Sequence, residues 1–164
     1  MSSVFNNLSF INSENVPSGQ WARVGIVVSE WNKDVTYKLL EGAVETLIQQ
    51  QVSDDAVKIV YVPGSYELPL AAQWLIEGYA CDAVICLGCV IQGETRHFDF
   101  ICESVARGIM DLNLKHNIPV IFGVLTTNTQ QQALDRAGGI YGNKGVEAAY
   151  AALKMMGLKN KCNL

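Results

Sequence analysis

The glycine-containing segment over residues 88–95 contains the residue types that most clearly could do chemistry. It reads Gly88-Cys89-Val90-Ile91-Gln92-Gly93-Glu94-Thr95 and differs from the phosphate-binding pattern GxxxxGK[ST] by a glutamate in place of the lysine. Because that lysine supplies the charge that holds terminal phosphates, Glu94 argues against nucleotide hydrolysis. The free N–H groups of a turn ahead of a helix could still bind a single phosphate. An ordinary strand-to-helix turn has a similar composition, so both interpretations stay open.

Of the two histidines of the chain, one has a position that gives it a structural role and the other does not. His116 lies near the C-terminal end of a predicted helix over 99–116, where a cation is favoured by the helix dipole. His97 lies at the start of that helix, where an imidazolium is disfavoured. A neutral imidazole there can transfer protons near pH 7. The residue types alone leave a catalytic and a structural role for His97 equally open.

Arg136 and Trp31 also have both functional and structural interpretations. Arg136 lies at the end of a predicted helix that begins at Thr129, where its guanidinium could compensate the dipole or bind a phosphate with two parallel hydrogen bonds. Trp31 lies between Glu30 and Asn32 at the end of a strand-like run. A core position is the commoner one for tryptophan, but these polar neighbours favour a pocket wall, where the indole could stack on a heteroaromatic ring.

We interpret the five cysteines as reduced, structural residues. Cys86 and Cys89 have the CxxC spacing of redox and zinc sites. They lie inside the strand-like run AVICLGCVI, however, away from the helix N-terminus that usually activates a redox thiol. Zinc would need two more ligands, and there is no second pair. The GxSxG and GxGxxG motifs and clusters of metal ligands are also absent from the sequence, so we expect no activated serine, no metal and no redox cofactor.

Alternating strands and helices must position these residues. Apolar, β-branched runs predict strands at 23–29, 57–62, 82–91 and 120–125. Helical spacing and end signals predict helices at 33–51, 68–77, 99–116, from 129 to the glycines at 138–139, and at 143–158. Strands that are apolar throughout favour a parallel sheet covered on both faces, an α/β architecture. Ligands of such folds bind beyond the C-terminal ends of the strands, which here are segments 30–32, 63–67, 91–97 and 126–129.

The composition and charge of the chain exclude some classes of function. The 164 residues, 49% of them hydrophobic, are expected to form one domain over 1–164, with residues 1–21 as an extended N-terminal arm. Lys and Arg are scattered and the net charge is −4, so we expect no nucleic-acid partner. Without a secretory signal or an apolar run of about 20 residues, we expect no membrane association and a cytoplasmic location. The charged fraction of 17%, against about 25% in typical domains, fits a surface partly covered by other subunits as well as an apolar monomer.

Four segments, in order, resemble the lumazine synthases of riboflavin biosynthesis. Residues 62–69, VPGSYELP, resemble PG[AS]xE[IL]P, and residues 87–98, LGCVIQGETRHF, resemble GxVIxGxTxH[FY]. Residues 122–126, FGVLT, and the pattern over 132–149 resemble the remaining two family segments. The match runs from about Arg23 to Leu158 without large gaps.

The resemblance implies a flavodoxin-like three-layer sandwich and a condensation that uses no cofactor. The family joins 5-amino-6-(D-ribitylamino)uracil to 3,4-dihydroxy-2-butanone 4-phosphate, giving 6,7-dimethyl-8-ribityllumazine, phosphate and water. An amine attacks a ketone, phosphate is eliminated, and the ring closes with loss of water. Such steps depend on proton transfer and orientation more than on a strong nucleophile.

The resemblance also implies a role for each matching residue. His97 is expected to transfer protons and Trp31 to stack on the pyrimidine. Phe122 is expected to reach into a neighbour's site, so that the pocket lies between subunits. The other residues expected to bind the uracil are Ser65, Tyr66, Glu67, Cys89, Val90 and Ile91, and those expected to bind the phosphate are Glu94, Thr95, Arg136 and Lys144.

Glu94 departs from the small residue that is usual in the family. A carboxylate beside a phosphate is repulsive by about 1 kcal/mol or more, unless the side chain faces solvent and only its N–H binds. The affinity for the phosphate substrate therefore depends on where Glu94 points.

Assembly is also implied by the resemblance, since the family forms pentamers and some members close into shells of twelve pentamers. The short stretch 138–144 is similar to that of shell-forming members, so we expect a sixty-subunit shell, with riboflavin synthase as a candidate partner. The N-terminal arm is expected to add an edge strand to a neighbour's sheet. Two alternatives are an inactive shell-forming or flavin-binding homologue, which His97 and Arg136 argue against, and a flavodoxin-like electron carrier, which lacks these motifs.

Overall fold

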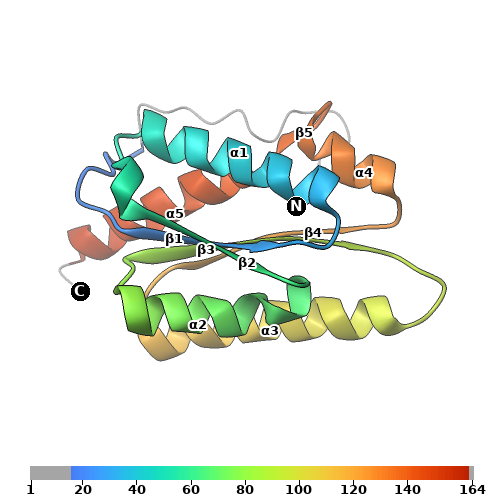
Figure 1. The fold of residues 1–164 in the computed structure, drawn as a ribbon. Coiled ribbons are helices and arrows are strands. Elements are labelled where there is room, and N and C mark those ends of the chain that lie inside the picture. The colour runs from blue at the N-terminus through green and yellow to red at the C-terminus, as the bar shows by residue number, and fades with distance from the viewer. Residues whose placement is uncertain (1–15, 163–164) are drawn as a thin grey trace.

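The structure, a computed structural model that describes residues 16–162, contains a parallel sheet between two layers of helices (Figure 1). Within that range the sheet has four strands in the order β2-β1-β3-β4, and all three pairings are parallel. The bounds are β1 (Val24–Ser29), β2 (Val57–Val62), β3 (Ala83–Ile91) and β4 (Val120–Thr127). The predicted α/β, flavodoxin-like sandwich is confirmed, with β4 two residues longer than expected.

Helices cover both faces of this sheet. Figure 1 shows α1 (Lys33–Gln49), α4 (Gln130–Asp135) and α5 (Lys144–Lys161) on one face, and α2 (Leu68–Tyr79) and α3 (His97–His116) on the other. The 3-10 turns η2 (Asp54–Ala56) and η3 (Ser65–Glu67) flank β2, and a hairpin of β5 (Ala137–Gly139) and β6 (Gly142–Asn143) precedes α5. Because all four strands are parallel, each crossover returns the chain to the same end of the sheet.

The core is divided by the sheet into two clusters. Along β1, Ile26 and Val28 pack with α1 and α5, whereas Val27 packs with α2 and α3. This alternation follows from the two-residue repeat of a strand, and it requires apolar side chains at every position when both faces are covered. All six residues of β1 are accordingly buried.

Cys86 and Cys89 lie on opposite faces of β3 because they are three residues apart in a strand. Both are free and buried. Burial raises the pKa of Cys86 to about 12 and that of Cys89 to about 11, which keeps both thiols neutral. Within residues 16–162 no cluster of His, Cys, Asp and Glu is arranged to hold a metal ion. Their burial on opposite faces of β3 supports the structural interpretation of the CxxC pair.

The predicted helix from Thr129 to the glycines at 138–139 is wrong at its end. The helix α4 ends at Asp135, and the chain then forms the β5–β6 hairpin. Gly138 and Gly142 have φ angles of +99° and +85°, a region that glycine adopts without the clash of a Cβ. Two N–H···O bonds from Tyr141 to Asp135 (2.9 Å) and from Lys144 to Arg136 (2.9 Å) hold the hairpin against the helix end.

Close packing of α5 on α1 decides which face of α1 is buried. A Cβ on Gly145 would collide with the Leu39 carbonyl, so glycine permits this approach. The buried face of α1 runs through Val35, Leu39, Ala43 and Leu47. Leu40 and Val44 are half-buried, and Ile48 is exposed.

Residues 16–23 lead into β1 and pack on the same chain. The Gly19 N–H donates to the Gln50 carbonyl at 2.8 Å, and Pro17 lies against Gly157 of α5. The rest of the expected N-terminal arm, residues 1–15, lies outside the described residues. Within 16–162, no helix combines the length and apolar content needed to cross a bilayer.

Candidate active site

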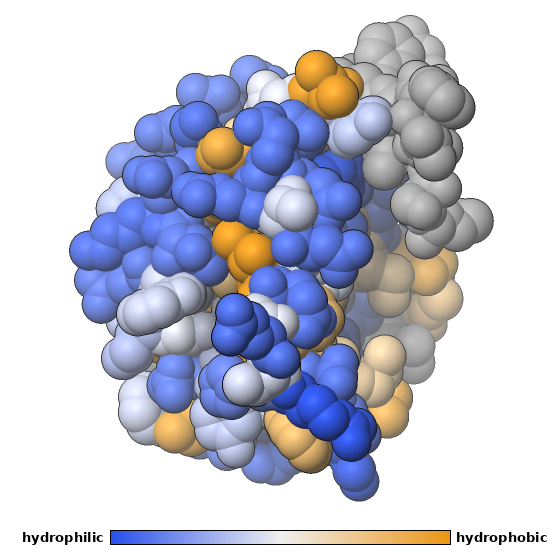
Figure 2. Space-filling view, turned by 90° about the vertical axis from the view of Figure 1, so that its right-hand side faces the viewer, coloured by the Kyte–Doolittle hydropathy of each residue, from blue (hydrophilic) through white to orange (hydrophobic). Residues whose placement is uncertain are grey.

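A cleft of about 870 Å³ lies at the C-terminal ends of β1, β2 and β3. It is lined by residues 31–32 after β1, 63–67 after β2, 89–91 at the end of β3, and one face of the first two turns of α3. In this strand order the crossovers from β1 and β3 lie on opposite faces of the sheet, which opens a crevice between the ends of these two strands. Figure 2 shows the molecule from this end, where the surface is mainly hydrophilic with small apolar patches.

Trp31 lies on the wall of this cleft with 72% of its surface exposed. Its backbone is held by the neighbouring strand, because its N–H donates to the Pro63 carbonyl at 3.1 Å and the Glu30 N–H donates to the Val62 carbonyl at 2.8 Å. The indole is therefore not a core side chain. Its open face favours the predicted stacking role.

The segment after β2 forms the floor beside Trp31. The Glu67 carboxylate accepts the Gly64 N–H at 3.0 Å, which fixes the turn η3. The Ser65 hydroxyl has no hydrogen-bond partner among the described residues and lies against Gly88, where a Cβ would come within 2.6 Å of it. Ser65 and the exposed Tyr66 both line the cleft.

His97 is the first residue of α3, and its side chain lies in the same cleft as Trp31. The Thr95 hydroxyl accepts the His97 N–H at 3.4 Å, which orders the turn before the helix. Glu94 and Thr95 are exposed in this turn, beside the cleft-lining residues rather than among them.

Arg136 and Lys144 meet at a single carboxylate on the other side of the sheet. The Arg136 Nη2 atom lies 2.7 Å from Glu147 Oε1, and the Lys144 Nζ atom lies 3.3 Å from Glu147 Oε2. The Arg136 Nη1–H also donates to the Tyr141 carbonyl at 2.7 Å. Two cations beside one carboxylate leave a net positive cluster, which can hold an anion such as phosphate.

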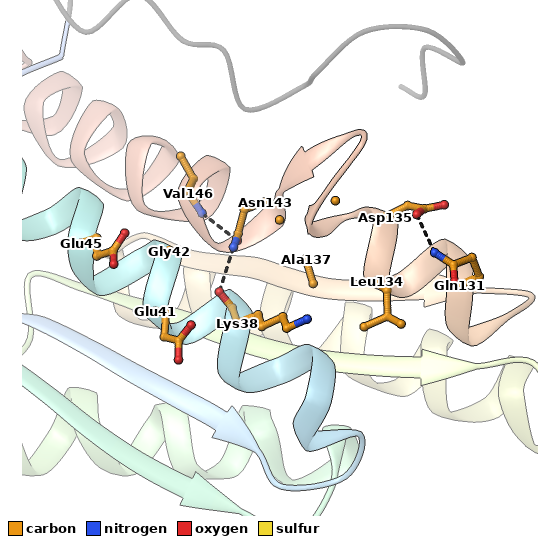
Figure 3. Close-up of a pocket in the computed structure, with 12 residues that line it drawn as sticks. Lys38, Glu41, Gly42, Glu45, Gln131, Leu134, Asp135, Ala137, Asn143 and Val146 are labelled. Carbon is orange, nitrogen blue, oxygen red and sulfur yellow. Dashed lines mark hydrogen bonds between the residues drawn. The ribbon is translucent and has the colours of Figure 1, made fainter.

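A second pocket, of about 520 Å³, lies between α1, α4 and the β5–β6 hairpin (Figure 3). The side chain of Asn143 crosses its wall and donates to the Lys38 carbonyl at 2.8 Å. Glu41, Glu45 and Asp135 also line it, and their carboxylates disfavour an anionic ligand. None of the residues predicted to bind substrate lines this pocket.

Comparison with known proteins decides the family. Residues 21–160 match the sequence model of the family described as 6,7-dimethyl-8-ribityllumazine synthase. The chain is 56% identical to the 6,7-dimethyl-8-ribityllumazine synthase of Cytophaga hutchinsonii over 156 residues, which cover 95% of this chain and 98% of that protein. It is 50% identical to the enzyme of the same name from Porphyromonas gingivalis over 159 residues, covering 97% and 99%. The chain belongs to the lumazine synthase family. The resemblance found in the sequence is therefore confirmed.

The residues predicted for a lumazine synthase site fall into two groups within one subunit. Eight of them line the cleft, namely Trp31, Ser65, Tyr66, Glu67, Cys89, Val90, Ile91 and His97. The other five do not line it, namely Glu94, Thr95, Phe122, Arg136 and Lys144. Phe122 is half-buried in β4 and packs toward the α2–α3 core. One subunit therefore presents the cleft and the cation cluster as separate surfaces.

Sequence reasoning missed several residues of this lumazine synthase fold that belong to the two groups. Phe100, Ile101 and Ser104 share the cleft with His97, and their spacing of three, four and seven residues from it was a usable helical signal. Glu147 gave no such signal, because an acidic residue in the first turn of a helix is an ordinary partner of the dipole. Asn32, also in the cleft, had no predicted role beyond that of a polar neighbour of Trp31.

Proposed function

We propose that the protein is a transferase that condenses 5-amino-6-(D-ribitylamino)uracil with 3,4-dihydroxy-2-butanone 4-phosphate to give 6,7-dimethyl-8-ribityllumazine, phosphate and water. The observation that carries this proposal is the single cleft that contains both Trp31 and His97. A flat aromatic face and a proton-transferring group in one open crevice suit a reaction between a heterocycle and a ketone.

The pyrimidine stacks on Trp31 in this proposal. Ser65, Tyr66 and Glu67 hold the ribityl chain and the ring, and the backbone of Cys89, Val90 and Ile91 lines the opposite side. Exposure of Trp31 and the fixed turn at η3 support this arrangement. The main requirement is orientation, because holding the amine near the ketone removes most of the entropic cost of the bimolecular step.

The phosphate is bound by the Glu94 and Thr95 turn of one subunit together with Arg136 and Lys144 of a neighbour. The separation of the cation cluster from the cleft within one subunit supports this division. A guanidinium has five N–H donors, so Arg136 can hold Glu147 and Tyr141 and still present donors to a phosphate. Phe122 of the neighbour closes the apolar side of the same site.

His97 moves the protons that the condensation requires. It accepts a proton from the attacking amine and returns one when water leaves, while elimination of phosphate is stabilised by the adjacent cations. This assignment uses only the position of the imidazole in the cleft and its chemistry near pH 7.

Assembly into pentamers, and of twelve pentamers into a shell, completes the proposal. Large apolar side chains are exposed on the layer of η3, α2 and α3, where they support contacts between subunits; they are Tyr66, Leu70, Trp74, Phe100, Met110 and Leu114. A riboflavin synthase inside the shell is the candidate partner, and the expected location is the cytoplasm. Light scattering on a size-exclusion column measures the particle mass, and a lone pentamer contradicts the shell.

The activity is tested by mixing the purified protein with both substrates and recording lumazine absorbance and fluorescence. We expect product to form at a rate proportional to protein concentration. An assembled particle that forms no product above the uncatalysed rate would instead favour an inactive shell-forming or flavin-binding homologue. Omitting the phosphate substrate is the matched blank.

A further inference from the structure

Asn32 spans the gap between two strands at the crevice. The pairing of β1 with β3 ends at Val28 and Leu87, yet β3 continues to Ile91, paired only with β4. Strand β1 therefore no longer provides partners for the last residues of β3. The Asn32 side chain replaces it there, because its Nδ2–H donates to the Cys89 carbonyl at 3.0 Å.

This use of the side chain is unusual for an asparagine that precedes a helix. At the N-cap, asparagine commonly accepts an N–H of the first helical turn with its side-chain oxygen. Asn32 is the N-cap of α1, but its side chain makes no capping hydrogen bond. Only its backbone carbonyl accepts from the helix, taking the N–H groups of Val35 (2.9 Å) and Thr36 (3.0 Å). Helix capping therefore does not explain why the side chain is an amide.

The backbone of Asn32 adopts a left-handed conformation, with φ 61° and ψ 48°. Asparagine tolerates this region better than most residues other than glycine. The conformation lies in the short connection from β1 to α1, directly after Trp31. The amide and the backbone angle together determine how this turn meets β3.

Trp31 depends on the turn for its position because its ring has little packing. With 72% of its surface exposed, the indole is held mainly through its backbone. That backbone is attached to the end of β2 by the Trp31 N–H to Pro63 bond, and to the end of β3 by the Asn32 amide. The two bonds set the spacing between the indole and residues 89–91.

We propose that Asn32 is a positioning residue, whose amide fixes Trp31 at a set distance from the end of β3 and so shapes the slot that receives the flat ring. The proposal rests on the proposed function for the identity of that ring. It does not place Asn32 in contact with reacting atoms. Loss of the amide should weaken binding of the uracil substrate while leaving the phosphate substrate almost unaffected.

The test compares Asn32→Gly, which keeps the left-handed angle and removes the amide, with Asn32→Asp, which keeps the shape and turns a donor toward the carbonyl into an acceptor. We expect the KM for the uracil substrate to rise about fivefold in Asn32→Gly and more in Asn32→Asp, from the strength of one hydrogen bond. The KM for the phosphate substrate should change less than about twofold, because the Asn32 amide bonds to the end of β3 and to none of the residues proposed to bind the phosphate. Asn117→Gly is the matched control, because Asn117 also has a positive φ, of 51°, but lies at the far end of α3.

A second measurement does not require turnover. In a background where Trp21 and Trp74 are replaced by phenylalanine, acrylamide quenching and fluorescence anisotropy report Trp31 alone. We expect faster quenching and lower anisotropy in Asn32→Gly than in Asn117→Gly, without any ligand. If Asn32→Gly and Asn32→Asp keep both the uracil KM and the Trp31 signal of the parent protein, Asn32 does not position the indole. If the parent protein itself makes no lumazine but the Trp31 signal shifts, the proposed function fails and the positioning role stands.

Discussion

Arg136 and Glu147 form a short, mostly buried ion pair. Their side-chain atoms lie 2.7 Å apart, and the two side chains are only 17% and 16% exposed. Lys144 contacts the second oxygen of the same carboxylate. Glu147 thus fixes the direction of the guanidinium and partly neutralises two cations that would otherwise repel each other.

Replacing Glu147 should affect both stability and phosphate binding. Glu147→Ala leaves a poorly solvated guanidinium without its partner, so we expect the free energy of unfolding to fall by about 3 kcal/mol in urea denaturation. We also expect a higher KM for the phosphate substrate, because Arg136 loses its fixed direction. Arg136→Ala should raise the same KM by more. An effect of Arg136→Ala confined to the uracil substrate would contradict the phosphate assignment.

Replacing His97 should slow the reaction without disturbing assembly. His97→Ala removes the proton-transferring group, so we expect kcat to fall by about a hundredfold, at the low end of general acid–base effects. Particle mass should stay unchanged, because His97 is not one of the exposed apolar residues assigned to contacts between subunits. The control is His116→Gln at the other end of the same helix, which should keep kcat. Equal rates for His97→Ala and the parent protein would remove His97 from the mechanism.

Glu94 should weaken binding of the phosphate substrate if its carboxylate faces the phosphate. We expect Glu94→Gln, which keeps the shape and removes the charge, to lower the KM for that substrate about fivefold, corresponding to about 1 kcal/mol of repulsion. The difference should shrink at about 0.5 M salt, because Glu94 is exposed and its charge is screened. An unchanged KM at low salt would mean that the side chain points to solvent.

The buried thiols should resist modification and make the fold sensitive to alkali. Burial raises the pKa of Cys86 to about 12 and of Cys89 to about 11, from 9.0. Their stabilising contribution is complete below about pH 9 and is lost as pH rises toward about 11 and 12, because the unfolded chain releases these protons first. At about pH 8, below the ordinary thiol pKa, we expect Ellman's reagent to label the exposed Cys162 quickly and these two only on unfolding. Rapid labelling of either in the native protein would refute their burial.

Local sequence signals were sufficient to predict the strands and helices, the parallel sheet and the end of the sheet that forms the cleft. Apolar runs and helical spacing are properties of short segments, and parallel strands joined by helical crossovers bring their C-terminal ends to one edge. Trp31 and His97 could therefore be assigned to one site from the order of residues alone, and the four motifs identified the family.

Which side chains meet across distant elements could be learned only from the folded chain. The helix α4 ended at Asp135, ahead of the positive φ angle of Gly138. The fold separated Arg136 from the cleft within one subunit. Glu147 formed ion pairs with both Arg136 and Lys144. The amide of Asn32 reached a carbonyl 57 residues away. Such contacts depend on how helices pack on the sheet and on left-handed backbone angles, which residue type and local spacing do not specify.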